Sequence, residues 1–244
     1  MTTPRGALVT GAAHGLGAHI ATALHTASYR VAITDHDEAA AQALAKTLGP
    51  PALALPLDVR DKQAFQNALS HLITYWGQVE VLVNNAALTE AVPVMDISPE
   101  AWDAVMATNA RGTFFGCQVF GAHFRTRGHG RIVNIASLAG QNGGTATGAH
   151  YAASKGAILT LTKVFARDLA PHVTVNAIAP GPLDTPAVHR TLPPDRLETL
   201  RAAIPVQTLG NPAFVATLVL QLASPEADFV TGATWDVNGG LFMR

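Results

Sequence analysis

The sequence has little of what disulfide frameworks, thiolate metal sites or membrane spans require. Its 244 residues include a single cysteine, Cys117, which excludes an internal disulfide and disfavours a metal site built on thiolates. Cys117 stands in an apolar run, where we expect a small buried side chain. No segment reaches the roughly 18 to 20 uninterrupted apolar residues of a membrane-spanning helix. We therefore predict a protein that does not enter a membrane.

Charge is scarce as well. Sixteen Lys and Arg residues face 17 Asp and Glu residues, so no basic field attracts nucleic acid or anionic lipid. The ten histidines show no His-Glu-x-x-His or similar spacing, and no metal is expected. The first residues lack the apolar stretch of a secretory signal. These absences favour a cytoplasmic protein that acts on a small molecule.

Hydrophobic residues are abundant, at 48%, and they occur in short apolar runs that alternate with longer segments of helical period. This rhythm is typical of an α/β fold with a parallel sheet covered on both faces. The segments expected to be strands are 7–9, 31–33, 53–55, 79–83, 132–135 and 173–178. Between two of them, apolar residues from Phe65 to Trp76 recur at helical spacing, and Asp61 is placed to cap that helix.

Nothing in the sequence marks a boundary between domains, so residues 1–244 are expected to form one domain. The proline-rich segment 182–212 differs in texture from the rest. It contains a short charged stretch, Asp195 to Glu198, which indicates an insertion with its own small helix. We interpret this segment as a cover over a substrate site.

The first expected strand runs into a glycine turn, Thr10-Gly11-Ala12-Ala13-His14-Gly15-Leu16-Gly17, and then into a helical segment. Glycine allows a sharp turn and lets a pyrophosphate approach the backbone at the helix N-terminus. A tight packing turn without a ligand is the alternative interpretation.

Asp35 follows the second strand, where dinucleotide folds place the acid that binds the adenosine ribose. A carboxylate there favours NAD, because it would repel a 2′-phosphate, and neither His14 nor His36 has the permanent charge of an arginine. NADP is the second choice. Read alone, Asp35 is also compatible with an ordinary turn or cap.

Tyr151 and Lys155 lie four residues apart, which places them on one face of a helix. An ammonium about 4 Å from the phenol lowers its pKa enough for proton transfer near neutral pH. Ser137 lies just after the expected strand 132–135, at the carboxyl ends of the strands, where its hydroxyl could polarise a substrate carbonyl. We hypothesise that these three residues form a catalytic group.

With these motifs, the chain resembles the short-chain dehydrogenase/reductase family, in its compact single-domain branch. The resemblance covers essentially the whole chain. It rests on the glycine turn, Asp58-Val59, Asn84-Asn85-Ala86-Ala87, Asn109, Ser137, Tyr151…Lys155, Pro180-Gly181…Thr185 and the closing Val230-Thr231-Gly232…Asp236-Val237-Asn238-Gly239-Gly240. It implies a doubly wound Rossmann fold with a mostly seven-stranded parallel sheet flanked by helices.

The resemblance also implies roles for individual residues. Ser137 would orient the substrate oxygen, Tyr151 would pass the proton, Lys155 would hold the nicotinamide ribose and Asn109 would anchor a proton-relay water. The residues implied to bind the cofactor are Gly11, His14, Gly15, Leu16, Gly17, Asp35, Asp58, Val59, Asn85, Ala86, Tyr151, Lys155, Pro180, Gly181, Leu183 and Thr185. Relatives pair two helices into dimers and tetramers, which predicts a homotetramer or homodimer here.

Three departures from the family pattern leave these groups intact. Ala87 replaces a usual glycine, Thr208 stands where many relatives carry arginine, and the loop between Ser137 and Tyr151 is one residue longer. We predict an NAD-dependent oxidoreductase acting on a secondary alcohol or ketone. Alternatives are an NADPH-dependent 3-oxoacyl thioester reductase, a catalytically silent dinucleotide sensor, and a sugar-nucleotide epimerase or dehydratase, although the larger C-terminal lobe of that last branch is missing.

The substrate is left open by the motifs. A 3-oxoacyl thioester, a cyclic diol, a sugar lactol and a small hydroxy acid are all compatible with them. Polar pocket candidates are Glu90, Gln141, Asn142 and His150, and apolar candidates are Leu183, Val188 and Leu192.

Overall fold

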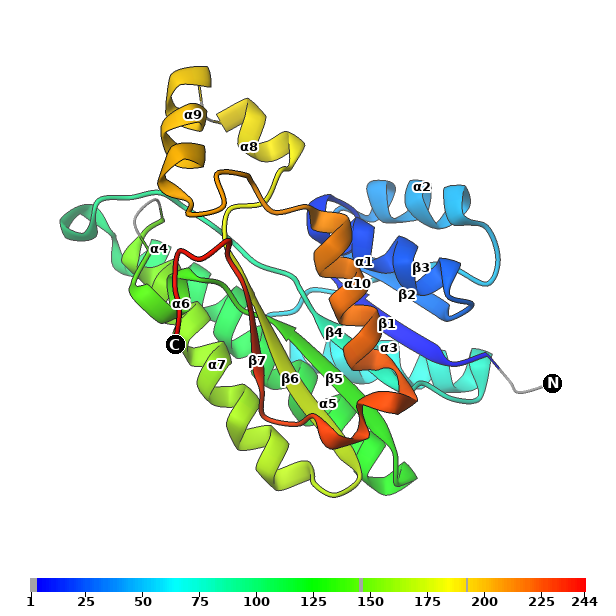
Figure 1. The fold of residues 1–244 in the computed structure, drawn as a ribbon. Coiled ribbons are helices and arrows are strands. Elements are labelled where there is room, and N and C mark those ends of the chain that lie inside the picture. Colours follow the sequence, from blue (N-terminus) through cyan, green and yellow to red (C-terminus); the bar gives the residue numbers. More distant parts are fainter. Residues whose placement is uncertain (1–3, 145–146, 192) are drawn as a thin grey trace.

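A computed structural model describes residues 4–144, 147–191 and 193–244. Seven parallel strands form one sheet in the order β3-β2-β1-β4-β5-β6-β7 (Figure 1). The strands are β1 (Gly6–Thr10), β2 (Arg30–Asp35), β3 (Leu53–Pro56), β4 (Val81–Asn84), β5 (Gly130–Ile135), β6 (Val173–Pro180) and β7 (Thr234–Val237). The expected doubly wound α/β fold is confirmed. The six expected strand segments all correspond to strands, whereas β7, a short strand containing Trp235 and Asp236, was not among them.

The strand order reverses between β1 and β4, which are neighbours in the sheet although β2 and β3 separate them in the chain. At such a reversal the loops after the two strands diverge to opposite faces, leaving a crevice at their carboxyl ends. The glycine turn follows β1, and Asn85-Ala86 follows β4. The topology therefore brings two of the predicted cofactor motifs to one place.

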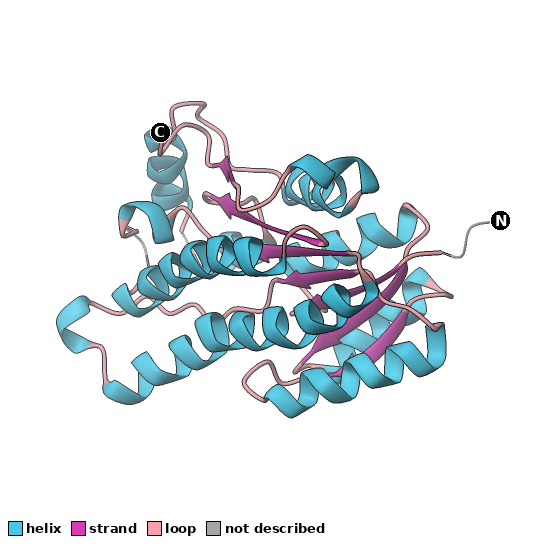
Figure 2. Ribbon diagram, turned by 90° about the horizontal axis from the view of Figure 1, so that it is seen from below, coloured by secondary structure: helices cyan, strands magenta, loops and turns pink. Residues whose placement is uncertain are grey.

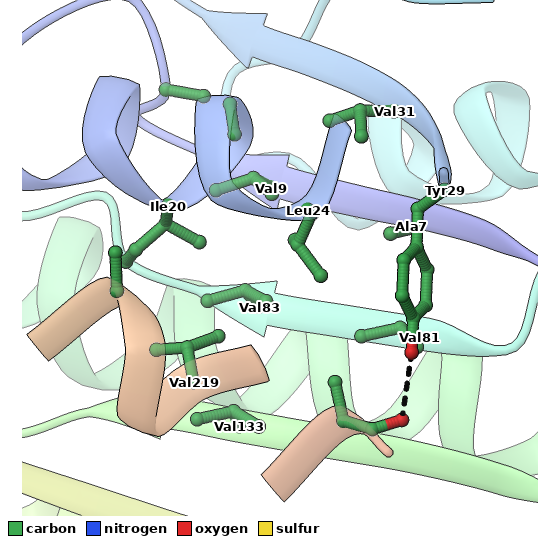
Figure 3. Packing of buried hydrophobic residues seen from close by; sticks show 14 of the residues in the cluster. Ala7, Val9, Ile20, Leu24, Tyr29, Val31, Val81, Val83, Val133 and Val219 are labelled. Carbon is green, nitrogen blue, oxygen red and sulfur yellow. Dashed lines mark hydrogen bonds between the residues drawn. The ribbon is translucent and has the colours of Figure 1, made fainter. Parts of the chain in front are cut away.

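One face of the sheet is covered by α1 (Gly15–Thr26), α2 (Glu38–Leu48) and α10 (Pro212–Ala223) (Figure 1). Figure 3 shows how Ile20 and Leu24 of α1 and Val219 of α10 meet strand residues such as Val9 and Val83. All of these side chains are fully buried. Apolar burial contributes about 25 cal/mol per Å², so this cluster is a main source of the fold's stability.

The other face is covered by α3 (Lys62–Trp76), α5 (Gly112–Arg127) and α7 (Ala149–Leu169), so that helices lie on both sides of the strands (Figure 2). The expected helix is confirmed as α3, since the Asp61 side chain accepts a hydrogen bond from Gln63 N and Phe65 and Leu72 are buried. Cys117 of α5 is fully buried, as expected, and burial raises the pKa of its thiol to about 12.

The proline-rich segment contains α8 (Pro186–Thr191) and α9 (Pro194–Ala203), which stand apart from the helix layers at one end of the molecule (Figure 1). The prediction of a small helix around Asp195 to Glu198 is confirmed by α9. Backbone hydrogen bonds from Gly210 N to Pro182 O and from Asp184 N to Gly210 O join the two ends of the segment, and Val206 N donates to Gly239 O outside it. The remaining helices are η1 (Val94–Asp96), α4 (Pro99–Val105), η2 (Met106–Arg111), α6 (Ala139–Asn142) and η3 (Pro225–Phe229).

Candidate active site

A cavity of about 490 Å³ lies at the crevice where the strand order reverses. Its lining includes most of the residues predicted from sequence to bind the adenosine and pyrophosphate of a dinucleotide. These are Gly11, His14, Leu16, Gly17, Asp35, Asp58, Val59, Asn85 and Ala86. Gly15 belongs to the same turn but does not line the cavity. A larger hollow of about 620 Å³ lies between α3 and α5, away from these strand ends.

The glycine turn requires glycine for close packing at two positions. A Cβ on Gly17 would lie 2.0 Å from Gly11 O, and Gly11 has a φ of +59° with Ala86 Cα 2.7 Å from where its Cβ would be. Asn85 holds the turn from the neighbouring strand end, because its Nδ2 donates to the carbonyls of Thr10 and Gly11. At the start of α1, His14 makes no side-chain cap, so the N–H groups of the first turn are not held by a capping side chain. This arrangement fits a pyrophosphate.

Asp35 is buried at the end of β2, and its carboxylate turns toward the glycine turn. Its Oδ2 accepts a hydrogen bond from Ala13 N at 3.0 Å, and its Oδ1 lies 2.9 Å from His36 Nδ1. His14 pairs similarly with Asp37 at 3.1 Å. Both histidines are therefore already engaged with carboxylates at the rim of the cavity.

Asp58 does not stand alone on the cavity wall. The Arg60 guanidinium binds its carboxylate through two nitrogens, with the Nε at 2.9 Å from Oδ1, and this bond holds the pKa of Asp58 below its usual range. Sequence reasoning missed Arg60 as a lining residue and considered only the two histidines as cations near Asp35. The sequence carried a signal, because Arg60 follows directly after the Asp58-Val59 motif.

Ser137, Tyr151 and Lys155 come together at the carboxyl end of β5. Ser137 follows β5, and its Oγ accepts a hydrogen bond from Ala139 N at the start of α6. Tyr151 and Lys155 lie on α7, with Lys155 Nζ 5.6 Å from the centre of the Tyr151 ring. Lys155 is buried, and its Nζ donates to Ile135 O, the last carbonyl of β5, at 2.7 Å. The expected shared face of one helix is thus present.

The pKa of Tyr151 differs from the sequence-based expectation. We expected Lys155 to lower it, but the surrounding protein desolvates the hydroxyl and raises its pKa, and hydrogen bonding with the side chains of Ser137 and Thr89 offsets only part of this effect. Burial also lowers the pKa of Lys155 to about 7. The expected lowering of the Tyr151 pKa was wrong for the protein without a cofactor, because burial disfavours the charged forms of both Tyr151 and Lys155.

Asn109 lies in η2, a π-helical turn between α4 and α5, and is fully buried. Its side chain clamps the backbone of Leu88, accepting from Leu88 N at 2.7 Å and donating to Leu88 O at 3.0 Å. It also donates to Ser154 Oγ on α7. π-turns inside helices are frequent at functional sites. The geometry gives Asn109 a positioning role, and the proton-relay water implied by the resemblance stays a prediction.

The last cofactor candidates, Pro180, Gly181, Leu183 and Thr185, lie at the end of β6 and in the segment after it. Leu138 N donates to Pro180 O, which ties the loop carrying Ser137 to the end of β6. Gly181 packs against Asn238, Leu183 bridges to Gly210, and the Thr185 hydroxyl accepts from Val188 N at the start of α8. Pro180, Gly181, Leu183 and Thr185 lie at the same end of the sheet as Ser137 but do not line the cavity around Asp35.

The loop candidates for the substrate pocket divide into two groups. Glu90 and His150 face each other, with Oε2 and Nε2 3.5 Å apart. Gln141 instead donates to Asp236, and the Asn142 side chain accepts a hydrogen bond from Gly144 N. Leu192 and residues 145–146 lie outside the described residues.

Comparison with known proteins decides the family. Residues 11–242 match the family model described as Enoyl-(Acyl carrier protein) reductase. The chain is 36% identical to a sorbitol dehydrogenase of Cereibacter sphaeroides, over 97% of both chains. It is 40% identical to an acetoacetyl-CoA reductase of Rhizobium meliloti, over 98% of this chain and 99% of the relative.

It is also 36% identical to a 3-oxoacyl-[acyl-carrier-protein] reductase of Escherichia coli, over 97% of both chains. The chain belongs to the short-chain dehydrogenase/reductase family. The resemblance inferred from its motifs is thereby confirmed, and so is its membership among oxidoreductases that bind a nicotinamide dinucleotide.

No helix among the described residues of this short-chain dehydrogenase/reductase is both long enough and apolar enough to cross a membrane. Nor do their His, Cys, Asp and Glu side chains form a group of three or more that would hold a metal ion.

Proposed function

We propose that this short-chain dehydrogenase/reductase uses NAD to oxidise a secondary alcohol or reduce the matching ketone. The observation that carries the proposal is the grouping of Ser137, Tyr151 and Lys155 at the carboxyl end of β5, at the same sheet edge as the cavity lined by the glycine turn and Asp35. When bound, the nicotinamide supplies the hydride acceptor or donor and, in its oxidised form, a positive charge.

In the proposed mechanism the protein positions the substrate and moves one proton. Ser137 donates a hydrogen bond to the substrate oxygen, and Tyr151 accepts the alcohol proton during oxidation or donates it during reduction. Lys155 would hold the nicotinamide ribose, and Asn109 orders the loop after β4 by binding both backbone groups of Leu88. Burial of Lys155 places its titration near neutral pH, where proton exchange with the phenol is feasible.

The proposed cofactor is NAD, held by the residues predicted from sequence. Asp35 supports this choice, because its buried carboxylate lines the cavity at the end of β2, where dinucleotide folds carry the acid that binds the adenosine ribose. Asp58 and Val59 would contact the adenine, and Gly11 to Gly17 with Asn85 and Ala86 would line the pyrophosphate path. Pro180, Gly181, Leu183 and Thr185 would lie along the nicotinamide.

A second candidate is an NADPH-dependent reductase of 3-oxoacyl thioesters. Two observations favour it: the relatives named as acetoacetyl-CoA and 3-oxoacyl reductases, and Arg60, whose permanent charge lines the same cavity. Against it, Arg60 is bound to Asp58 through two nitrogens, which leaves less of its charge for a phosphate. A catalytically silent dinucleotide sensor is the third candidate and would not need Ser137, Tyr151 and Lys155 together.

The test is a panel of secondary alcohols, ketones and 3-oxoacyl thioesters followed by nicotinamide absorbance with both cofactors. We expect turnover with NAD(H) to exceed that with NADP(H) by at least about tenfold in kcat/KM, which corresponds to about 1.4 kcal/mol. A reversed preference with thioester activity would establish the second candidate, and binding without turnover across the panel would favour the sensor.

We also propose that the chain folds as one domain and acts in the cytoplasm, with segment 182–212 covering the substrate. We further propose that it assembles as a homotetramer or homodimer. Apolar side chains on α5 and α7 support the assembly, because Phe114, Phe165 and Val164 remain partly exposed. Exposed apolar patches of this kind mark subunit contacts. Sedimentation that finds a stable monomer at micromolar concentration would exclude it.

A further inference from the structure

The loop after β4 is attached to the catalytic group by three consecutive residues. Leu88 is clamped on both backbone groups by Asn109, and the neighbouring Thr89 side chain is among the groups that act to lower the pKa of Tyr151 against its burial. The Glu90 carbonyl accepts from Gly148 N at 2.9 Å, just before α7 begins. The position of this loop therefore bears directly on the surroundings of the Tyr151 hydroxyl.

His150, the residue before Tyr151, is unusual in its burial. Its side chain is fully buried, and neither ring nitrogen has a hydrogen-bond partner among the described residues. A buried polar group without a partner is unfavourable, so the nearest polar group is important. For Nε2 that group is the Glu90 carboxylate at 3.5 Å, within the range of an ion pair but long for a hydrogen bond.

The chain makes room for this imidazole with a glycine. A Cβ on Gly148 would lie 2.3 Å from His150 Cε1 and 2.6 Å from Nδ1. The φ of Gly148 is −66°, which any residue adopts, so its backbone does not require glycine. The ring of His150 and, at 3.0 Å, the Glu90 carbonyl are what a methyl group would meet.

We propose that Glu90 and His150 form a positioning pair, which holds the loop after β4 against the start of α7 and so keeps Thr89 on the Tyr151 hydroxyl. His150 does not touch the reacting atoms in this arrangement; it acts through Glu90. The functional part of the inference rests on the proposed role of Tyr151 as the proton-transferring group. The pairing itself rests only on burial and contacts.

The first test is a double-substitution cycle with Glu90→Leu and His150→Phe, which preserve much of the volume but remove the polar pair. We expect each single change to lower kcat about tenfold with the KM for NAD unchanged, and the double variant to be no worse than either. Glu90→Gln, which keeps an acceptor oxygen, should retain most of the kcat of the parent enzyme. Independent, additive losses, or a parallel rise in the KM for NAD, would overturn the pairing.

The second test uses Gly148→Ala, which leaves both side chains in place. We expect it to displace the ring and lower kcat to the level of His150→Phe, but to have little further effect in a His150→Ala background. A full extra loss in that background would show that the methyl group acts through the Glu90 carbonyl instead.

Thermal unfolding of the cofactor-free variants separates this inference from the proposed function. The same non-additivity should appear in the unfolding midpoints, whether or not the enzyme turns over. If Tyr151→Phe remained active, the proposed function would fail while coupled midpoints still supported the pair. Additive midpoints would refute the pair whatever Tyr151 does.

Discussion

The two sides of the crevice handle charge in opposite ways. On the nucleotide side, formed by the glycine turn 11–17, Asp35, His36 and Asp58 to Arg60, the permanent cation stays in water, because the Arg60 side chain is 58% exposed. On the catalytic side, formed by Asn109, Ser137, His150, Tyr151 and Lys155, the basic group is buried, and Lys155 is 2% exposed.

This difference sets the size of effects that each side produces. Exposed ion pairs contribute roughly 0 to 1 kcal/mol, so the nucleotide side tunes a preference between similar cofactors. Burial can shift the pKa of an ionisable group by several units, and removing one partner of a buried ion pair strongly destabilises the protein. We therefore expect substitutions on the catalytic side to have the larger consequences, and the predictions below test that order.

The largest effect is expected at Tyr151. Tyr151→Phe removes the hydroxyl that transfers the proton and keeps the ring, so kcat should fall by about 10² to 10⁴ while the affinity for NAD stays within about twofold. Steady-state kinetics and calorimetry measure the two quantities. Tyr75→Phe is the matched control, because Tyr75 is 71% exposed on α3. Retained turnover in Tyr151→Phe would remove Tyr151 from the mechanism.

One substitution on the nucleotide side should also have a large effect, because the constraint at Gly17 is steric and not electrostatic. Gly17→Ala should destabilise the protein by about 2 kcal/mol or more and weaken NAD binding, since its methyl group would meet Gly11 O. In Gly156→Ala on α7 the nearest atom is 3.4 Å away, and this control should be neutral or slightly stabilising. Chemical unfolding of both variants measures the difference, and equal midpoints would contradict it.

The parts of the site that sequence could predict are those made by local spacing. The glycine turn follows β1 directly, Asp35 ends β2, and four residues separate Tyr151 from Lys155, so chain order alone places each on its element. Nearly all the strands were predicted for the same reason, because their apolar runs are continuous. The short β7, with Trp235 and Asp236, has no such run.

What sequence could not predict depends on side chains that meet across the fold. The attachment of Arg60 to Asp58 is a matter of rotamer, and the approach of Glu90 to His150 joins residues 60 positions apart in the chain. The pKa of Tyr151 was predicted in the wrong direction because spacing reveals a nearby cation but not the desolvation that surrounds both groups.

Lys155 should make the stability of the ligand-free protein depend on pH. Its pKa of about 7 in the folded state lies below its value in the unfolded chain, so the unfolded state binds more protons between these two pKa values. The cost of burying its charge is then complete below about pH 7 and disappears as the pH rises toward 10.

Lys155→Met removes this cost. Its advantage over the parent in free energy of unfolding should be greatest near pH 6 and should shrink by up to about 1.4 kcal/mol per pH unit above pH 7. Urea unfolding at pH 6, 7, 8 and 9 measures it, with Lys163→Met, an exposed site on the same helix, as the control. A difference independent of pH would show that Lys155 is not buried as a charge.

The smallest effect is expected at Asp35, and here the contrast between the nucleotide side and the catalytic side is most easily contradicted. Asp35→Asn removes the negative charge that opposes a 2′-phosphate and keeps the oxygen that accepts from Ala13 N, so the ratio of NAD to NADP in kcat/KM should fall by about tenfold. Asp37→Asn, beside it at the rim and paired with His14, should change the ratio by less than about twofold, because its carboxylate is more exposed. Adding Arg60→Gln to Asp35→Asn should return part of the preference for NAD, since it removes a permanent cation that lines the same cavity. If Asp35→Asn leaves the ratio unchanged while Arg60→Gln alone shifts it, the exposed arginine and not the buried carboxylate selects the cofactor, and the nucleotide side works by a surface charge after all.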